Sequence, residues 1–257
     1  MHDANLQYHV QLGPGDVGRY VLLPGDPGRC EKIAAYFDNP VHIASNREYT
    51  TYTGTLLGEK VSVTSTGIGG PSAAIAVEEL AKLEVDTFIR VGTAGGMQPF
   101  CRPGDLAIVT GAIRDEGTSL HYMPIEFPAV ANLQVVSALR QAAQRVGARA
   151  HLGISQSKDS FYGEIEPARM PVAPRLQRRW KAWVDGGAIC SEMEAATIFI
   201  VASVLGKRAG GVMFMGGSTI MSQEEYAALA ATLTLDQLIQ TAVEAVKILI
   251  EQDRGRS

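Results

Sequence analysis

The sequence predicts one α/β domain in which helices flank a central, mixed and twisted β-sheet. Its 257 residues suffice for a single large domain with a substantial core. Segments with strand patterns alternate along the chain with segments of helical periodicity. The chain contains no linker, internal repeat or low-complexity stretch, so residues 1–257 are expected to form one domain.

Strands are predicted where short apolar or alternating runs end in turn residues. In the first, residues 20–23, Tyr-Val-Leu-Leu runs directly into Pro24-Gly25. Residues 50–66 alternate between apolar and polar positions and are divided by a turn at Gly58-Glu59. The same patterns predict strands at 87–89, where the run ends at Arg90, and at 106–113, 151–157 and 211–215.

Helices are predicted where apolar residues recur at helical spacing. Pro27 suits the first turn of a helix that carries Ile33 and Phe37. Four more segments show this periodicity or a strongly helix-forming composition, namely 73–83, 131–146, 196–205 and 235–250. Residues 158–190 contain prolines at 167, 171 and 174 and yield no predicted element. Alternating strands and helices imply a largely parallel or mixed sheet that is covered on both faces.

The composition excludes several classes of protein. A net charge of −4 without a run of like charge argues against nucleic-acid binding, which depends on a basic surface. No stretch approaches the roughly 20 apolar residues of a membrane span, and the N-terminus has no apolar signal core. Cys30, Cys101 and Cys190 form no C-x-x-C pair, so no zinc or redox motif is expected. So few cysteines suit a reducing, cytoplasmic location.

Arg29 lies in Gly25-Asp26-Pro27-Gly28-Arg29, at a junction between a strand and a helix. Backbone N–H groups at such a junction point towards an anion, and the helix dipole favours negative charge there. The Arg29 guanidinium would add a full positive charge. An ordinary β-α turn, with Asp26 capping the helix and Arg29 on the surface, explains this segment equally well.

Arg90 opens the segment Arg90-Val91-Gly92-Thr93-Ala94-Gly95-Gly96, at the expected carboxyl end of a buried strand. Ligands of open α/β sheets gather at such ends. A charge directly after Phe88-Ile89 must find a partner or a cavity, and Thr93 offers a hydroxyl. The alternative interpretation is a buried structural ion pair followed by a glycine turn.

A third arginine, Arg47, lies in Ser45-Asn46-Arg47-Glu48-Tyr49-Thr50. The guanidinium fork matches phosphate geometry, yet the chain lacks the nucleotide P-loop pattern G-x-x-x-x-G-K-[ST]. The three arginines therefore predict a site for free phosphate. In Glu192-Met193-Glu194, carboxylates precede an apolar helix, where they either favour the helix dipole or accept the hydroxyls of a sugar diol.

Together these segments resemble the nucleoside phosphorylase family, which includes the uridine phosphorylases and the hexameric purine nucleoside phosphorylases. The resemblance extends from about Tyr8 to Ile250 and is strongest to the uridine phosphorylases. Each motif is weak alone, but six agree in order and spacing: Gly25-Asp26-Pro27-x-Arg29, Arg47-Glu48-x-Thr50, Ser65-Thr66-Gly67-Ile68-Gly69-Gly70-Pro71-Ser72, Ala76-Val77-Glu78-Glu79-Leu80, Glu126-Phe127-Pro128-Ala129-Val130 and Glu192-Met193-Glu194.

The resemblance implies a pentosyltransferase that cleaves a nucleoside with inorganic phosphate to give a free base and (deoxy)ribose 1-phosphate, without an organic cofactor. Arg29, Arg90 and Glu194 would be the catalytic residues. The phosphate site would be lined by Gly25, Arg29, Arg90 and Thr93, and by Arg47 of a neighbouring subunit. A held and oriented phosphate is a competent nucleophile, and its charge stabilises the oxocarbenium-like ribose.

The resemblance also implies the remaining contacts and the assembly. The ribose would be held by His9 from the neighbouring subunit and by Met193 and Glu194. Base contacts would come from Gly95, Phe161, Glu164, Glu166 and Arg169. Glu48, Ile68 and Ser72 match positions that hold a monovalent cation, K⁺, between subunits in some relatives. The expected assembly is a homohexamer built from dimers with shared active sites.

The base-binding segment departs from the family pattern. Uridine phosphorylases carry a Gln-x-Arg pair after Phe-Tyr-Pro-Gly, and without gaps Ile165 and Pro167 occupy those two positions. Neither side chain can hydrogen-bond uracil oxygens, whereas Glu164 or Glu166 would accept a proton from an N–H group. Gly216-Gly217 replaces bulky residues and would enlarge the pocket. The base half is therefore either remodelled for a non-uracil base, such as a purine, or restored by other loop residues.

Three other functions compete with phosphorolysis. A nucleosidase that uses water would not need a phosphate cradle of three arginines. A nucleoside-binding protein without turnover is compatible with the altered base contacts. A dinucleotide-dependent dehydrogenase is disfavoured because Gly67-Ile68-Gly69-Gly70-Pro71-Ser72 breaks the G-x-G-x-x-G pattern at its sixth position.

Overall fold

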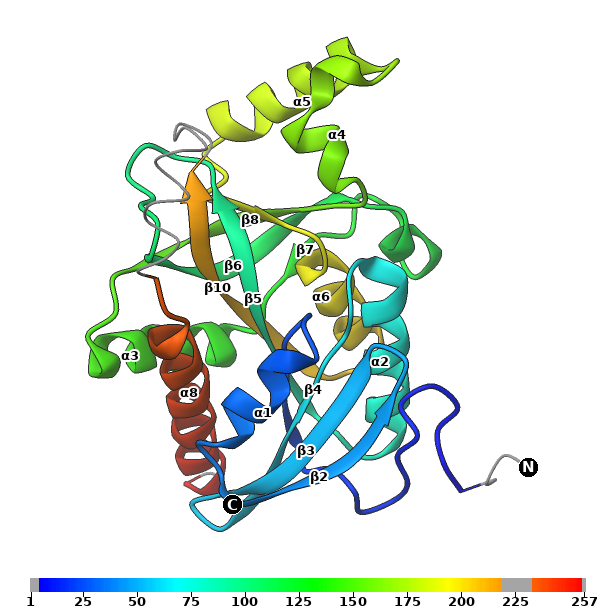
Figure 1. Cartoon of the computed structure of the whole chain (residues 1–257), viewed down its shortest axis with the longest axis vertical. Coiled ribbons are helices and arrows are strands. Elements are labelled where there is room, and N and C mark those ends of the chain that lie inside the picture. Colours follow the sequence, from blue (N-terminus) through cyan, green and yellow to red (C-terminus); the bar gives the residue numbers. More distant parts are fainter. Residues whose placement is uncertain (1–4, 219–232, 256–257) are drawn as a thin grey trace.

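The computed structural model describes residues 5–218 and 233–255 (Figure 1). Its strands are β1 (Tyr20–Leu23), β2 (Asp38–Asn46), β3 (Tyr49–Leu56), β4 (Glu59–Thr64), β5 (Thr87–Gly96), β6 (Leu106–Asp115), β7 (Ala129–Val130), β8 (Ala150–Lys158), β9 (Cys190–Glu192) and β10 (Arg208–Ser218). Its α-helices are α1 (Gly28–Ala34), α2 (Gly70–Lys82), α3 (Leu133–Val146), α4 (Phe161–Ile165), α5 (Ala173–Asp185), α6 (Ala195–Val204) and α8 (Asp236–Arg254). Short 3₁₀ turns cover Thr118–His121 and Pro167–Arg169.

The strands form one mixed sheet, so the predicted α/β class is confirmed. Along the sheet the order is β10-β6-β8-β9-β5-β1-β4-β3-β2, with β7 beside β6. Strand β10 also pairs with β5, in parallel, while it pairs antiparallel with β6. Strands β5, β9, β8, β6 and β10 therefore close into a ring, and β1, β4, β3 and β2 continue the sheet from β5.

Strand β5 continues to Gly96, so the prediction that this strand ends at Arg90 is wrong. Its glycines suggested a loop, but β10 pairs with it along its whole length, from Arg208 opposite Thr87 to Ser218 opposite Gly96. The two strands fit closely, because a Cβ on Gly92 would lie 2.5 Å from the Met213 sulfur. Arg90 thus sits in the middle of a buried strand.

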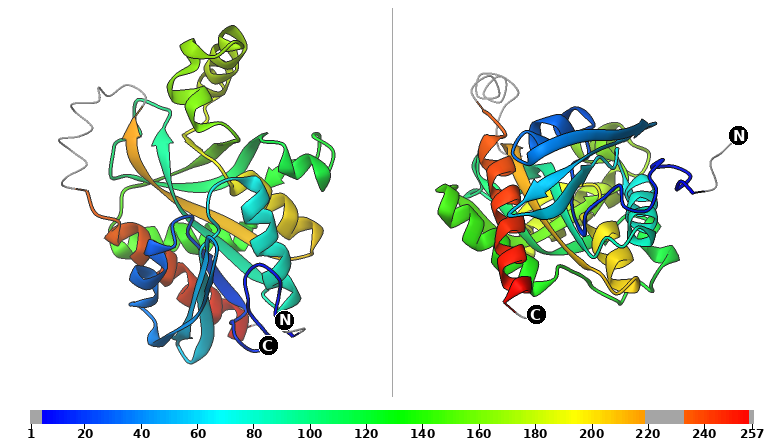
Figure 2. Two further views of the ribbon diagram at one scale, coloured as in Figure 1. Left: turned by 45° about the vertical axis from the view of Figure 1, so that its right-hand side comes forward. Right: turned by 90° about the horizontal axis from the view of Figure 1, so that it is seen from below.

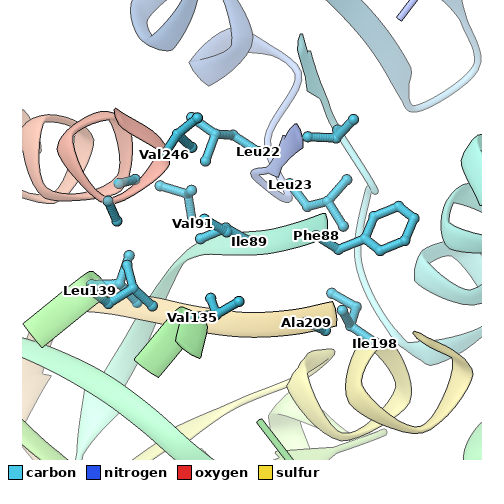
Figure 3. Close-up of a cluster of buried hydrophobic side chains, with 14 of the residues drawn as sticks. Leu22, Leu23, Phe88, Ile89, Val91, Val135, Leu139, Ile198, Ala209 and Val246 are labelled. Carbon is cyan, nitrogen blue, oxygen red and sulfur yellow. The ribbon is translucent and has the colours of Figure 1, made fainter. Parts of the chain in front are cut away.

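Apolar side chains from the central strands and the flanking helices form the core (Figure 3). Leu22 of β1 and Ile89 of β5 are at most 1% exposed. Helix α6 is apolar on all sides and its residues Ala195–Ala202 are buried, as expected for a helix enclosed by other elements. Burial of these groups drives folding, at about 25 cal/mol per Å² of apolar surface. Among the side chains labelled in Figure 3, those on helices come from α3, α6 and α8.

The segment 158–190, for which no element was predicted, contains α4, α5 and β9. Pro167 and Pro174 lie in the first turns of a 3₁₀ turn and of α5, where the missing N–H carries no penalty. Helices α4 and α5 project from one end of the molecule (Figure 2). None of the α5 residues is fully buried. Within the described part of the chain, no helix combines the length and apolar character of a membrane span.

Candidate active site

Two loops at the ends of β1 and β4 lie against each other. The Gly67 N–H donates to the Gly25 carbonyl at 3.0 Å, and the Thr66 N–H donates to the Pro24 carbonyl at 2.8 Å. Gly67 has φ +68°, and a Cβ there would lie 2.7 Å from Cγ of Glu48. Only glycine satisfies both the backbone angle and the close approach. These contacts place Gly25 beside the loop that leads into α2.

Arg29 is buried against β5 and is not on the surface. It is 9% exposed, and its Nη1 donates to the Val91 carbonyl at 2.9 Å. Burial lowers the pKa of Arg29, and the positive charge of Arg90 nearby adds to this effect. A guanidinium stays charged even so. The first helical turn therefore brings its cation to the residue that follows Arg90.

Arg90 is the most enclosed charge of the site, with 4% exposure. Its Nε donates to Oε2 of Glu192 at 2.8 Å, and its Nη2 forms an ion pair with Glu194. Burial opposes the charged form, but the carboxylates of Glu194 and Glu192 outweigh it and raise the pKa of Arg90. Its Nη1 is buried and has no hydrogen-bond partner among the described residues.

Glu194 is held at the start of α6 and is 3% exposed. Its Oε1 accepts the Gly69 N–H at 2.6 Å. Burial raises the pKa of Glu194, although Arg90 opposes the shift, and the charge of Glu192 raises it further. Glu192 itself accepts the N–H groups of Glu194 and Ala195, both at 2.9 Å. The helix start and its two carboxylates are thus one hydrogen-bonded unit.

This arrangement suits an anion that lies next to a polyol. Two buried guanidiniums, Arg29 and Arg90, lie close enough to repel each other. A buried donor without a partner costs about 1–3 kcal/mol, and a phosphate oxygen at Nη1 of Arg90 would satisfy it. Glu194 borders the same spot with an acceptor that can receive hydroxyl protons. Phosphate and a sugar diol would therefore meet across the Arg90–Glu194 pair.

Thr93 and Gly95 lie on β5, the strand that carries Arg90, and Met193 lies between Glu192 and Glu194 in the chain. Thr93 is exposed on β5, three residues after Arg90, and Met193 is partly buried between the two carboxylates. Gly95 pairs with Ser191 of β9 on one side and with Gly217 of β10 on the other. Their contacts with phosphate, ribose and base stay predictions.

His9 and Arg47 lie apart from the buried cluster. His9 Nδ1 is 2.7 Å from Oε1 of Glu79, and the Asn46 side chain donates to the His9 carbonyl at 2.7 Å. Arg47 is exposed at the tip between β2 and β3, with φ +55°. The two residues therefore lie near each other, and their role across a subunit interface stays a prediction.

The residues predicted to hold a cation lie near His9 and Arg47, namely Glu48, Ser72 and Ile68. The Ser72 hydroxyl lies 2.8 Å from Oε1 of Glu48 and also contacts the Thr66 carbonyl. A hydrogen bond within its own residue and the one from Ser72 lower the pKa of Glu48. Ile68 is 78% exposed. Carboxylate, hydroxyl and carbonyl oxygens are the ligands of hard cations, so this donor set fits the expected K⁺.

Comparison with known proteins identifies the family of the chain. The family model described as "Phosphorylase superfamily" matches residues 19–251. The chain belongs to the phosphorylase superfamily. It is 49% identical to a uridine phosphorylase of Treponema pallidum, covering 100% of this chain and 99% of the relative. A uridine phosphorylase of Thermococcus kodakarensis is 46% identical, and the match covers 99% of this chain and 90% of that relative. A guanosine phosphorylase of Halorubrum lacusprofundi is 38% identical, and the match covers 85% of this chain and 86% of that relative.

The family match confirms the predicted enzyme class, a pentosyltransferase of the nucleoside phosphorylase type. It favours phosphorolysis over the nucleosidase, binding-protein and dehydrogenase alternatives. The two loops, the buried arginines and the start of α6 therefore form the candidate active site of a phosphorylase.

The residues of this phosphorylase that were predicted to contact the base lie in two different environments. Phe161 is half-exposed at the start of α4. Glu164 points into the protein, where it accepts from Lys158 Nζ at 3.0 Å and lies 2.7 Å from the Ser191 hydroxyl. Glu166 and Arg169 instead form an ion pair with each other, and both side chains are at least half-exposed. The structure therefore groups Glu164, but not Glu166 or Arg169, with the enclosed residues.

Lys158 is the residue that the sequence analysis missed. It is 7% exposed, at the end of β8, and directly follows Ser157, whose hydroxyl contacts Glu192. A lysine that ends an otherwise uncharged strand, Ala150–Lys158, was the signal available, because such a cation needs a partner. That partner, Glu164, lies on a helix that the sequence did not predict.

Replacing Gly92 with alanine is expected to disturb Arg90 in this phosphorylase. The added Cβ would lie 2.5 Å from the Met213 sulfur and 3.0 Å from Cζ and Nη2 of Arg90. Overpacking of this kind costs about 1–3 kcal/mol, and we expect at least about a tenfold loss of kcat/KM because the guanidinium moves. Thermal unfolding measures the loss of stability, and phosphorolysis assays measure the loss of kcat/KM. Gly255→Ala, whose Cβ meets nothing closer than 3.6 Å, is the control; unchanged activity in Gly92→Ala would contradict the prediction.

Proposed function

We propose that this phosphorylase cleaves uridine with inorganic phosphate, giving uracil and ribose 1-phosphate. The observation that carries the proposal is the Arg90–Glu194 ion pair beside the unpaired Nη1 of Arg90. Arg90 offers a site for an oxyanion, and Glu194 offers an adjacent site for a sugar diol within the same buried unit. The whole-length likeness to uridine phosphorylases supports uridine as the nucleoside.

The proposed chemistry uses position and charge. Arg29, Arg90 and the hydroxyl of Thr93 hold phosphate, and Glu194 holds the ribose hydroxyls with Met193 beneath the ring. A phosphate oxygen forms a bond to C1′ as the bond from C1′ to the base breaks. The anionic nucleophile stabilises the positive charge that develops on the ribose ring.

One feature favours a second candidate, a phosphorylase for a larger base. Gly217 lies directly opposite Gly95, so two strands that border the predicted base region lack side chains there. A purine nucleoside would use this room, and the guanosine phosphorylase of Halorubrum lacusprofundi is a relative. It matches less of this chain at lower identity than the uridine phosphorylases do.

Release of free base from a panel of nucleosides, with and without phosphate, tests both candidates. We expect cleavage of uridine that requires phosphate, with weaker cleavage of inosine, guanosine, adenosine, cytidine and thymidine. Preference for a purine nucleoside would replace the first candidate by the second. Base release without phosphate would indicate a hydrolase, and binding without any release would indicate a protein without turnover.

We propose further that the enzyme is a homohexamer built from dimers, in which Arg47 and His9 complete the partner's site. Arg47 is exposed, His9 is partly buried, and both lie near Glu48, which supports this arrangement. Arg47→Ala and Arg90→Ala subunits, each inactive alone, are expected to recover activity when refolded together, because one site of each hybrid dimer has both arginines. Random pairing predicts recovery of about a quarter of wild-type activity. No recovery in mixtures that sediment as hybrids would exclude shared sites.

We propose K⁺ as the ion held by Glu48, Ser72 and the backbone at Ile68, where it would stabilise the dimer. Sedimentation in potassium chloride and in tetramethylammonium chloride compares the assembly with and without a fitting cation. Identical association in both salts would reject this role.

A cytoplasmic location and a role in nucleoside salvage complete the proposal. The three cysteines, Cys30, Cys101 and Cys190, are buried free thiols, which suits a reducing compartment. Cell fractionation tests the location, and growth on uridine as a carbon source with and without the enzyme tests the role.

A further inference from the structure

A buried ion pair lies next to the phosphate and ribose residues but takes no part in holding either. Lys158 Nζ is 3.0 Å from Oε1 of Glu164 and 2.6 Å from the Ser191 hydroxyl. The side chains of Lys158 and Glu164 are 8% and 15% exposed. Taking two charges out of water is unfavourable and does not generally stabilise a fold, so such a pair calls for a functional explanation.

The surroundings of this pair place it at the base end of the nucleoside. Ser191 pairs in register with Gly95, and Ser157, the neighbour of Lys158, contacts Glu192 of the Arg90 unit. The ammonium lies 5.9 Å from the centre of the Phe161 ring, the predicted stacking platform. Contacts therefore lead from Arg90 through Glu192 and Ser157 to the neighbouring Lys158, and from there to Glu164.

The pair is also reachable and is not sealed in the core. Lys158 and Glu164 line a cavity of about 370 Å³ between β8 and α5, together with Gln156 and Trp180. Gln156 Oε1 lies 2.6 Å from the Ser191 hydroxyl, so the wall of the cavity offers both donors and acceptors. A planar polar ring can therefore contact the pair without displacing packed apolar side chains.

We propose that Lys158 and Glu164 recognise the edge of a 2,4-dioxopyrimidine and replace the missing Gln-x-Arg pair. The Glu164 carboxylate accepts the N3–H, and the Lys158 ammonium donates to a neighbouring carbonyl oxygen. Cytosine has no hydrogen on N3, so its lone pair would face the carboxylate. This recognition rests on the proposed cleavage of uridine and names the residues that select the base.

Lys158 has a second task in the reaction, because the base departs as an anion. The phosphate oxygen bonds to C1′, and the electron pair of the C1′–N1 bond stays with uracil, where it spreads over N1, O2 and O4. The anion then takes a proton from water. A fixed ammonium at a carbonyl oxygen stabilises this charge as it develops, and the exclusion of water from a side chain that is only 8% exposed strengthens the effect.

The experiment compares Lys158→Met and Glu164→Gln with wild type on uridine, 5-fluorouridine and cytidine at saturating phosphate. Fluorine makes uracil a better leaving group, so 5-fluorouridine depends less on Lys158. Lys181→Met, on the exposed face of α5 with its side chain 75% exposed, is the matched control. Lys158→Met/Glu164→Gln removes both charges at once and is measured alongside, because Lys158→Met alone leaves Glu164 buried without its cation.

We expect Lys158→Met to lower kcat/KM about 100-fold on uridine and about tenfold or less on 5-fluorouridine. Glu164→Gln should narrow the preference for uridine over cytidine at least about tenfold, since an amide can either donate or accept. Equal losses on both uridines, or an unchanged preference, would show a merely structural pair and overturn the proposal. In that case wild type still cleaves uridine, and the proposed function stands. Wild type that cleaves other nucleosides but not uridine would overturn both.

Discussion

Replacing Arg90 with alanine is expected to lower kcat/KM for phosphorolysis about 1,000-fold or more. Arg90 supplies the buried Nη1 that awaits an oxyanion, and it also holds Glu194. Alanine therefore removes the phosphate donor and releases the ribose acceptor together. It also leaves Glu192 and Glu194 buried without their cation, which costs about 3–5 kcal/mol of folding free energy. Thermal unfolding must accompany the assay.

Arg90→Lys separates these effects, because it keeps the charge but lacks the planar fork. We expect it to fold, with KM for phosphate raised more than KM for the nucleoside. Arg145→Ala removes an exposed arginine that pairs with Glu244 and should leave both constants unchanged. Full activity of Arg90→Ala, or an Arg90→Lys enzyme with unaltered phosphate dependence, would remove Arg90 from the anion site.

Replacing Glu194 with glutamine is expected to lower kcat/KM about 100-fold. The amide keeps the shape of the side chain and can still accept from the Gly69 N–H, but it loses the charge that accepts two ribose hydroxyls strongly. Nucleosides that lack the 2′ or 3′ hydroxyl should lose less. Glu59→Gln, an exposed carboxylate paired with Arg254, is the control. Equal losses on ribosides and deoxyribosides would argue against the diol contact.

The same substitution should change how stability depends on pH. Burial raises the pKa of Glu194 in the folded state, so the folded protein binds this proton more tightly than the unfolded chain does. The wild-type free energy of unfolding therefore falls as pH rises from the ordinary carboxyl pKa through the raised one. Glu194→Gln lacks this contribution and should gain stability relative to wild type over that window. Urea unfolding without phosphate at several pH values measures this difference in the free energy of unfolding. A variant that loses stability relative to wild type as pH rises through that window would contradict the prediction.

The sequence predicted the strands and helices best where periodicity and burial agree. The segments predicted at 20–23, 131–146 and 235–250 correspond to β1, α3 and α8, with α3 beginning two residues and α8 one residue later than predicted, because apolar spacing alone decides such segments. Strand β5 was predicted too short, since its glycines suggested a turn after Arg90. Pairing with β10 keeps these residues extended, and a partner about 120 residues away in the chain leaves no local signal.

The residues of the candidate site also fall into those that the sequence predicted and those that only the structure revealed. Arg29, Arg90 and Glu194 were predicted from motifs, and the structure brings them together. Lys158 was not predicted, because its partner Glu164 lies on α4, in a segment whose prolines concealed two helices. Arg169 was offered as a base contact, yet it pairs with Glu166 at the surface.

The sequence by itself determined the chemistry this chain carries: arginines without a P-loop, a pair of carboxylates before an apolar helix, and strands that alternate with helices. Residue types and short spacings encode these features, so they can be read locally. The tertiary structure decided which guanidinium nitrogen remains unpaired, which carboxylate each cation meets, and that β10 closes the sheet onto β5. Those outcomes depend on contacts between distant segments, where burial and hydrogen bonding outweigh any local preference.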